Sequence, residues 1–208
     1  MVVHLYGERC HIPEDIKVPI IEDCCEALWI KPRGIGCYSF YGNKAITTGE
    51  GGMLVGLDAR DWRDGGFDEE YRNVLPGLNY RMSNLQAAVG LAQLERFDSM
   101  LAVRLRNAAR YKDSLPGLGK WLFVVRTGNP RGLRDHLAEN GVSSRFVFTP
   151  LHRSPAFRAY ARGKYKNSDA VWENGLCLPT GPHLTEEQQE KVTSLVHSYL
   201  RRSSIGNL

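Results

Sequence analysis

The sequence predicts an α/β protein, with a partial mixed sheet and flanking helices, that is followed by a smaller α+β domain. Short continuous apolar runs in the first half of the chain suit strands that are covered on both faces of a parallel sheet. Apolar residues then recur at helical spacing from about residue 84. Strand and helix signals alternate beyond that point. We therefore expect two domains, over residues 1–99 and 100–208.

The expected strands of the first domain end at polar or glycine residues. Apolar runs stand at 2–6, 18–21, 36–41 and 53–55. Glu22 and Asp23 stop the second run, and Gly42, Asn43 and Lys44 stop the third. Open α/β sheets bind ligands at the carboxyl ends of their strands, so these stops are candidate site positions.

Capping signals predict most of the helices. Ser83 with Gln86 forms a capping box for a helix expected over about 84–115, with a break near 97–99. Residues 58–76 form an expected loop. In the second domain we expect strands over 121–125 and 144–148. We expect helices over 130–141 and 185–201, the second of them capped by Thr185 with Gln188.

Composition excludes several classes of protein. The 208 residues are 42% apolar and carry a formal charge of +4, as in a globular protein without a nucleic-acid-binding cluster. The five cysteines show neither CxxC nor Cys/His ligand spacing, so we expect no disulfide framework and no metal. No apolar run approaches the ~20 residues that span a bilayer. We expect a cytoplasmic protein that binds neither membrane nor nucleic acid.

Lys44 is the first candidate for chemistry. A lone lysine after a strand is usually a solvated surface residue. Lys44, however, follows a buried-type strand and lies among glycines at positions 42, 49, 51 and 52. A lysine amine held out of water can form a Schiff base with an aldehyde, which is the reaction that pyridoxal phosphate (PLP) requires.

Asp23 and Ser39 could supply the other groups that PLP needs. An acid at the pyridine nitrogen makes the ring an electron sink, and Asp23 ends the strand before the one that leads to Lys44. Taken alone, Asp23 is more readily interpreted as a helix N-cap, and its pairing with Lys44 at the next strand end favours the functional interpretation. Ser39 offers a hydroxyl for the phosphate, although by itself it is an ordinary strand serine.

Four ordered motifs resemble the DegT/DnrJ/EryC1/StrS sugar aminotransferases. They are EDCCEA at 22–27, SFYGNK at 39–44, TTGEGG at 47–52 and GLNYRM at 77–82. The second and third are typical of GDP-perosamine synthase-like nucleotide-sugar 4-aminotransferases. The resemblance extends to nearly the whole chain. It implies a truncated PLP-dependent transferase of fold type I, without the N-terminal half of the large domain and its helix-start phosphate turn.

The resemblance implies a set of cofactor-binding residues. Lys44 would be the Schiff-base lysine and proton shuttle, and Asp23 would hold the pyridinium nitrogen. Glu26 would contact the ring face or hydroxyl, and Ser39 the phosphate. Asn79 would reach the phosphate of the neighbouring subunit, so the resemblance implies a homodimer with shared active sites.

The resemblance also implies the substrates. Arg81, Arg145 and His152 match family positions near the substrate. The expected reaction moves an amino group from an amino acid, L-glutamate by resemblance, to a 4-keto-6-deoxy nucleotide sugar. Members that dehydrate sugars at C3 carry histidine in place of the lysine, so Lys44 argues against that reaction. A non-catalytic truncated homologue that binds a full-length aminotransferase remains the alternative.

Overall fold

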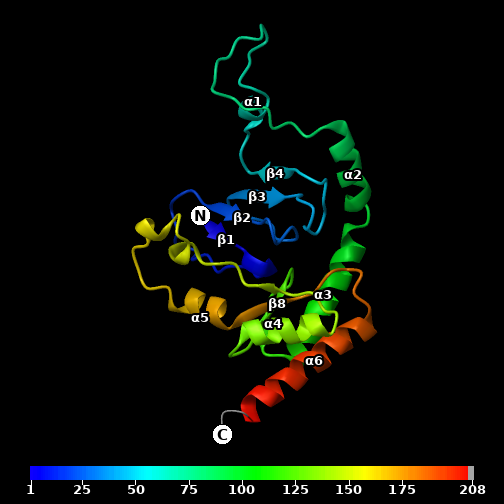
Figure 1. Cartoon of the computed structure of the whole chain (residues 1–208). Coiled ribbons are helices and arrows are strands. Elements are labelled where there is room, and N and C mark those ends of the chain that lie inside the picture. The colour runs from blue at the N-terminus through cyan, green and yellow to red at the C-terminus, as the bar shows by residue number, and fades with distance from the viewer. Residues whose placement is uncertain (206–208) are drawn as a thin grey trace. The chain divides into compact units, whose positions relative to one another are not determined.

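The structure, a computed structural model, describes residues 1–205 of the chain. The chain divides into two compact units, Met1–Leu101 and Ala102–Leu208 (Figure 1). Helix α3 (Phe97–Ser114) contains the division between them.

A four-stranded mixed sheet forms the centre of the first unit. Its order is β1 (Val2–Val3), β2 (Ile21–Asp23), β3 (Ile35–Ser39) and β4 (Gly52–Val55). The first three strands are parallel, and β4 runs antiparallel to β3. This arrangement confirms the expected partial mixed sheet with flanking helices. Within the described residues β1 and β4 each pair on one side only, so both edges of the sheet carry unpaired backbone groups.

Two strand predictions were wrong at their ends. The strand expected over 2–6 stops at Val3, because a 3₁₀ turn, η1 (Leu5–Gly7), follows and Tyr6 adopts φ 55°. The strand expected over 18–21 starts only at Ile21 and continues through Glu22 and Asp23. The two acidic residues therefore belong to the strand and do not stop it. Their charge is accommodated by hydrogen bonds that sequence periodicity does not reveal.

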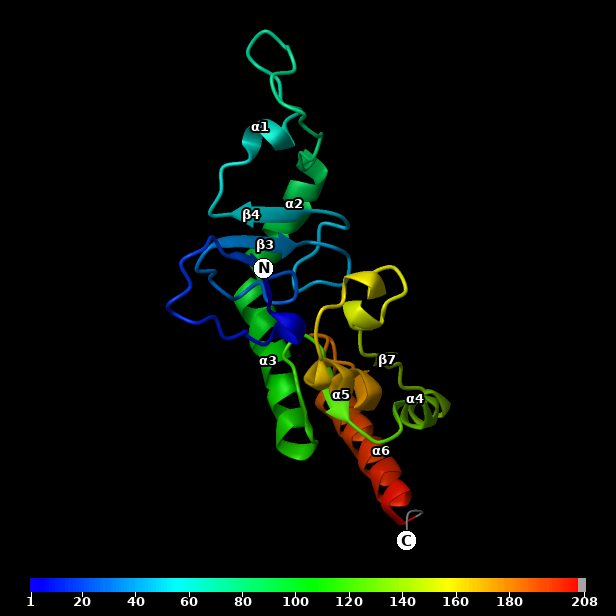
Figure 2. The same ribbon diagram turned by 90° about the vertical axis from the view of Figure 1, so that its left-hand side faces the viewer.

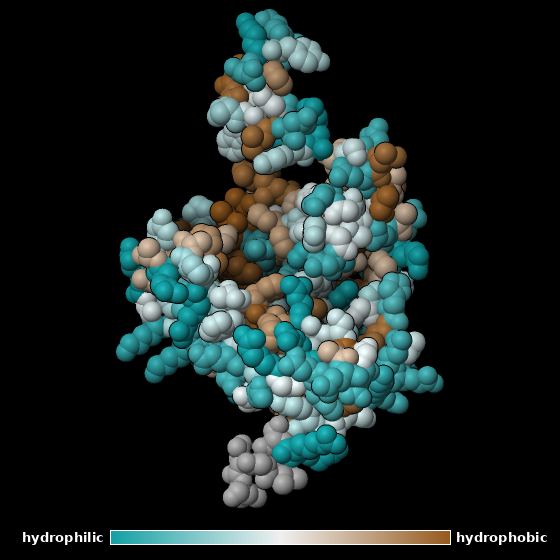
Figure 3. Space-filling model, viewed as in Figure 1, coloured by the Kyte–Doolittle hydropathy of each residue, from teal (hydrophilic) through white to brown (hydrophobic). Residues whose placement is uncertain are grey.

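The expectation that these strands are covered on both faces was also wrong for β4. All four residues of β4 are exposed, with Met53 54% accessible. Helix α2 (Asn84–Leu94) likewise contains no buried residue. Figure 3 shows the resulting apolar surface over β4. The exposed apolar residues of β4, the following turn and α2 are Met53, Leu54, Val55, Leu57, Leu85, Val89, Leu91 and Leu94.

The helices of the first unit agree with their capping signals. Ser83 and Gln86 form the predicted capping box at the start of α2. The expected long helix is interrupted at Glu95 and Arg96, slightly before the predicted break, and α3 follows. The loop expected over 58–76 contains one short helix, α1 (Arg60–Arg63). Figures 1 and 2 show α2 beside the sheet.

The second unit is built on an antiparallel sheet. Its order is β5 (Gly117–Leu118), β6 (Phe123–Arg126), β8 (Gly175–Leu178) and β7 (Arg145–Phe146). The helical segments are α4 (Pro130–Glu139), η2 (Leu151–Arg153), η3 (Arg158–Tyr160), α5 (Lys166–Asn174) and α6 (Glu186–Ile205). Within residues 1–205 none of the helices is long and apolar enough to cross a membrane.

Sequence patterns found α4 and α6 but missed α5 and β8. Asn129 caps α4 by accepting a hydrogen bond from the Gly132 N–H, and Pro130 stands in its first turn. Thr185 and Gln188 exchange the predicted capping bonds at the start of α6. Helix α5 passes into β8 at Gly175 without a turn, so no punctuation separates the two elements.

A continuous apolar core stabilises the second unit. It contains residues from both central strands, β6 and β8, and from helices α3, α4 and α6. The fully buried members include Tyr111, Phe123, Leu133, Leu137, Leu176 and Val196. Burial of these side chains on both faces of β8 explains why this short run, GLCL, is a central strand.

We expect Leu176→Ala to lower the free energy of unfolding of the second unit by about 2–5 kcal/mol, because it opens a cavity in a closely packed core. Leu151→Ala is the matched control, since Leu151 is 67% exposed. It should change stability by no more than about 0.5 kcal/mol. Denaturant unfolding measures both. Equal effects would contradict the placement of β8 at the centre of this core.

Candidate active site

The pairing of β2 with β3 brings the two strand ends of interest to one edge of the sheet. Asp23, the last residue of β2, lies opposite Cys37 of β3. Strand β3 continues to Ser39 and then enters the loop that contains Lys44. The carboxyl ends of parallel neighbours meet at the same edge, so Asp23 and the Lys44 loop leave the sheet together.

The Lys44 loop is closed at its base by backbone hydrogen bonds. The Phe40 N–H donates to the Gly51 carbonyl at 2.8 Å, and the Thr48 N–H donates to the Phe40 carbonyl at 2.9 Å. Inside the loop the Lys44 N–H donates to the Tyr41 carbonyl at 3.0 Å, which forms a turn at the lysine. The side chain is half-buried rather than fully solvated. The loop therefore presents Lys44 from a fixed base.

Two side-chain amides of α2 anchor the turn that follows the loop. The Gln93 amide accepts from the Thr47 N–H at 3.1 Å and donates to the Thr47 carbonyl at 2.5 Å. Gln86 donates to the Glu50 carbonyl at 3.1 Å. A glutamine amide that bonds both the N–H and the carbonyl of one residue takes the place of a neighbouring strand. Helix α2 thus holds the TTGEGG turn, a role that the spacing of its apolar residues did not indicate.

The charges of Asp23 and Lys44 both affect the pKa of the Cys25 thiol. The Cys25 N–H donates to Asp23 Oδ1 at 3.0 Å, and the thiol lies 3.7 Å from the Cys37 carbonyl oxygen. Burial, followed by the hydrogen bond and charge of Asp23, raises the pKa of Cys25 to about 12, while the positive charge of Lys44 opposes the rise. The carboxylate and the amine therefore both lie within electrostatic reach of this sulfur.

The helix N-cap alternative for Asp23 is wrong. Its carboxylate accepts a hydrogen bond from the N–H two residues later, as in an Asx turn. In the described chain the residues after Asp23 form turns, and the next α-helix is α1. The Asx turn orients the half-buried carboxylate at the strand end.

Glu26 and Ser39 lie in the same unit, and each has a backbone partner. A Glu26 carboxylate oxygen accepts from the Tyr6 N–H at 2.7 Å. That bond supports the left-handed backbone of Tyr6. Ser39 Oγ accepts from the Tyr41 N–H at 3.3 Å, at the start of the Lys44 loop. The Ser39 hydroxyl hydrogen can still donate to an acceptor such as a phosphate oxygen.

Asn79 and Arg81 lie on the extended loop between β4 and α2. Both are exposed. Asn79 forms an isolated backbone bridge with Asp64, and Arg81 Nη1 donates to the Asp64 carbonyl at 3.2 Å. These described contacts of Asn79 and Arg81 lie within the loop, and none of them is with Asp23.

Arg145 and His152 belong to the second unit. The Arg145 guanidinium lies 5.0 Å from the centre of the Phe148 ring. His152 Nε2 lies 2.8 Å from Asp169 Oδ1, and its ring stacks on Tyr165 at a centroid distance of 4.3 Å. Hydrogen bonds from Arg153 and His152 lower the pKa of Asp169 to about 2. The histidine is therefore oriented by a carboxylate that stays charged at neutral pH.

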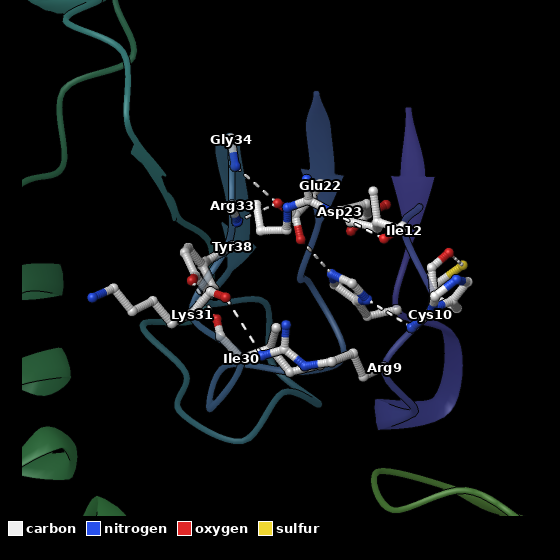
Figure 4. Close-up of polar contacts among 12 residues, drawn as sticks. Arg9, Cys10, Ile12, Glu22, Asp23, Ile30, Lys31, Arg33, Gly34 and Tyr38 are labelled. Atoms are coloured by element: carbon white, nitrogen blue, oxygen red, sulfur yellow. Dashed lines mark hydrogen bonds and ion pairs between the residues drawn. The ribbon is translucent and has the colours of Figure 1, made fainter. Parts of the chain in front are cut away.

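Sequence analysis missed one buried polar cluster next to Asp23. Glu22 and His4 are both inaccessible to solvent, and their side chains are 3.0 Å apart. Figure 4 shows Glu22 on β2 between neighbouring strands. The signal in the sequence was an acid inside an apolar run, with a histidine in the preceding run. We had interpreted that acid only as the end of a strand.

Comparison with known proteins gives one consistent group. The model of the DegT/DnrJ/EryC1/StrS aminotransferase family matches residues 1–197. The chain is 36% identical to a GDP-perosamine synthase of Caulobacter vibrioides over 96% of its own length and 65% of that protein. It is 31% identical to Bacillus subtilis EpsN, whose name describes a pyridoxal phosphate-dependent aminotransferase, over 94% of this chain and 62% of EpsN.

A solved structure shares the fold. A DegT/DnrJ/EryC1/StrS aminotransferase from Brucella abortus superposes with a TM-score of 0.85 at 28% identity, covering 96% of this chain and 64% of that chain. The chain thus spans slightly less than two thirds of the proteins that it matches.

Cys25 offers a test of the site in the protein without added ligand. We expect Asp23→Asn to speed alkylation of Cys25 at mildly alkaline pH, because it lowers the thiol pKa, and each unit of that fall raises the thiolate fraction about tenfold. Lys44→Gln should slow the same reaction, because it removes the charge that favours the thiolate. Site-resolved mass spectrometry measures both rates.

The exposed Cys10 serves as the internal reference in each variant. Its alkylation rate should stay constant. If both substitutions speed the alkylation of Cys25, or both slow it, then Asp23 and Lys44 do not have opposite effects on the pKa of its thiol.

Proposed function

The chain belongs to the DegT/DnrJ/EryC1/StrS aminotransferase family, and we propose on that premise that it is a PLP-dependent sugar aminotransferase. The observation that carries the proposal is the β2–β3 register, which brings a strand-end carboxylate, Asp23, and the Lys44 loop to one edge of the sheet, within electrostatic reach of the half-buried Cys25 thiol. PLP requires an acid at its ring nitrogen and an amine at its aldehyde.

The residues present fit PLP as a donor set. When bound, PLP supplies an aldehyde that takes up an amine and a ring that withdraws electrons from the attached carbon. Lys44 Nζ would hold the cofactor covalently, and the Asp23 carboxylate would keep the ring nitrogen protonated. The Ser39 hydroxyl would donate to the phosphate, and Glu26 would lie toward the ring. The Asx turn at Asp23 and the closed base of the Lys44 loop support these roles.

Lys44 would also move the proton that any amino transfer requires. Its amine can accept a proton from the carbon of the amino donor and return it, provided that the loop holds it in reach. The anchoring of the TTGEGG turn by Gln86 and Gln93 limits how far the loop can swing. We propose that this fixed loop lets one amine serve both as cofactor tether and as proton carrier.

We propose a 4-keto-6-deoxy nucleotide sugar as acceptor and L-glutamate as amino donor. The similarity to GDP-perosamine synthase and the SFYGNK and TTGEGG motifs support the sugar class. Arg81, Arg145 and His152 are the proposed substrate-binding residues. Asn79, exposed on its loop, would reach the cofactor phosphate of a second copy, so the proposed active form is a homodimer. EpsN and the Brucella abortus protein are aminotransferases by name, which gives no support to the non-catalytic alternative.

We expect the purified protein to form a coloured adduct with PLP that borohydride fixes on Lys44. Lys44→Ala should abolish the adduct because it removes the amine to which we assign the covalent bond. Lys17→Ala, which changes an exposed lysine of the same unit, is the matched control and should leave it intact. Absorbance spectra and peptide mapping measure the outcome. An adduct on another lysine, or none in folded protein, would overturn the cofactor assignment.

We expect L-glutamate to discharge the coloured form of the protein, because donation of its amino group converts the cofactor to the amine form. D-glutamate is the control and should leave the spectrum unchanged. Stopped-flow absorbance measures the change. A stable spectrum with L-glutamate, in protein that carries the Lys44 adduct, would remove glutamate as the donor while leaving the cofactor assignment in place.

A further inference from the structure

A fully buried carboxylate adjoins the proposed cofactor-binding aspartate. Glu22 Oε1 accepts from the backbone N–H groups of Arg33 at 2.5 Å and Gly34 at 2.9 Å (Figure 4). Glu22 Oε2 lies 3.0 Å from His4 Nε2. Burial acts to raise the pKa of Glu22, but the bonds from Gly34, His4 and Arg33 outweigh it and hold the pKa below its usual range. The group is therefore a charged carboxylate whose oxygens are all engaged.

The hydrogen bonds of His4 determine which ring nitrogen carries the proton. The Cys10 N–H donates to Nδ1 at 3.1 Å, and a backbone N–H can only donate. Nδ1 is therefore the acceptor, and Nε2–H donates to Glu22. The imidazole can bond both partners in only one orientation, so the two hydrogen bonds fix the rotation of the His4 side chain.

The backbone of His4 holds the other side of the same strand end. Its N–H donates to the Asp23 carbonyl at 3.0 Å, across the β1–β2 pairing. On the opposite side the Cys24 N–H donates to the Cys37 carbonyl at 2.8 Å. One residue, His4, thus contacts Glu22 through its ring and Asp23 through its amide.

Alternation along β2 makes the two acidic side chains depend on each other. Consecutive side chains of a strand point to opposite faces of the sheet, so Glu22 and Asp23 cannot turn independently. Rotation or slippage of β2 that moved the Asp23 carboxylate would pull Glu22 from three donors. A buried carboxylate that loses its partners strongly destabilises the fold. The cluster therefore resists that motion.

We propose that His4 and Glu22 are positioning residues, which lock the end of β2 so that the Asp23 carboxylate meets the ring nitrogen of the cofactor. This inference rests on the proposed PLP-dependent function. It assigns the buried pair a role in cofactor selectivity, beyond holding the strands together. The loss of positioning should weaken the interaction at the ring nitrogen more than the contacts elsewhere on the cofactor.

The test compares the affinities for PLP and for its 1-deaza analogue, in which carbon replaces the ring nitrogen. The unaltered chain should prefer PLP, and Asp23→Asn sets the value expected when that preference is lost. Glu22→Gln places an amide donor against His4 Nε2–H, so it should reduce the preference about tenfold while changing the affinity for the analogue little. Glu14→Gln, at an exposed position, is the matched control.

A pair of substitutions at His4 separates positioning from general damage. The amide of glutamine can place its nitrogen where Nε2 stands, so His4→Gln retains the donor to Glu22 and should keep most of the preference. The amide of asparagine matches the Nδ1 position, so His4→Asn retains only the Cys10 contact. This variant should lose the preference for PLP. Both remove the ring, and thermal unfolding of each variant without cofactor reports its structural cost.

Three outcomes decide the matter. Loss of preference in Glu22→Gln and His4→Asn, but not in His4→Gln, supports the proposal. Proportional loss of both affinities, or an unchanged preference, overturns it while leaving the cofactor assignment intact. Failure of the unaltered chain to bind either compound overturns the proposed function itself. If Glu22→Gln does not fold, the two His4 variants give the same comparison.

Discussion

The parallel register of β2 with β3 is the constraint on which the candidate site depends. It places Asp23 beside Cys37, and thereby sets the carboxylate next to the strand that leads into the Lys44 loop. A shift of one residue would exchange the faces on which Glu22 and Asp23 lie. It would bury the Asp23 carboxylate and expose that of Glu22, which accepts three hydrogen bonds. The register of β2 and the placement of both carboxylates are therefore fixed by the same set of bonds.

Polar contacts hold the loops and strand ends of this part of the chain in shape. One buried cluster of the first unit contains only Cys24, Ala27 and Ile30, with Trp29 and Tyr38 packed against it. The second unit has a continuous core that includes three helices. In the first unit, amides from α2 and the carboxylate of Glu22 satisfy loop and strand-end backbone groups. Hydrogen bonds of this kind are directional, so they fix angles that apolar packing leaves free.

The sequence predicted strand ends and helix caps better than the long-range contacts that support them. Strand ends, glycine-rich turns and capping boxes are local patterns, and they located Asp23, Lys44, α2 and α6. The roles of Glu22, His4 and Gln93 depend on partners far away in the sequence, 18 residues for the His4–Glu22 pair and 46 for Gln93 with Thr47. Periodicity carries no information about such pairs. The same limitation hid β8, whose four buried residues resemble any short apolar run.

The electrostatics of the site follow from where each carboxylate can find donors. Glu22 faces inward and accepts hydrogen bonds from two backbone N–H groups and an imidazole, so its charge is balanced by donors within the fold. Asp23, facing outward, receives the Cys25 N–H at Oδ1 and remains half-buried at a strand end. Its charge acts outward on the Cys25 thiol, against the charge of Lys44. Two adjacent acids thus differ in what they contact: the inner one stabilises strand geometry, and the outer one keeps a half-buried carboxylate at the strand end.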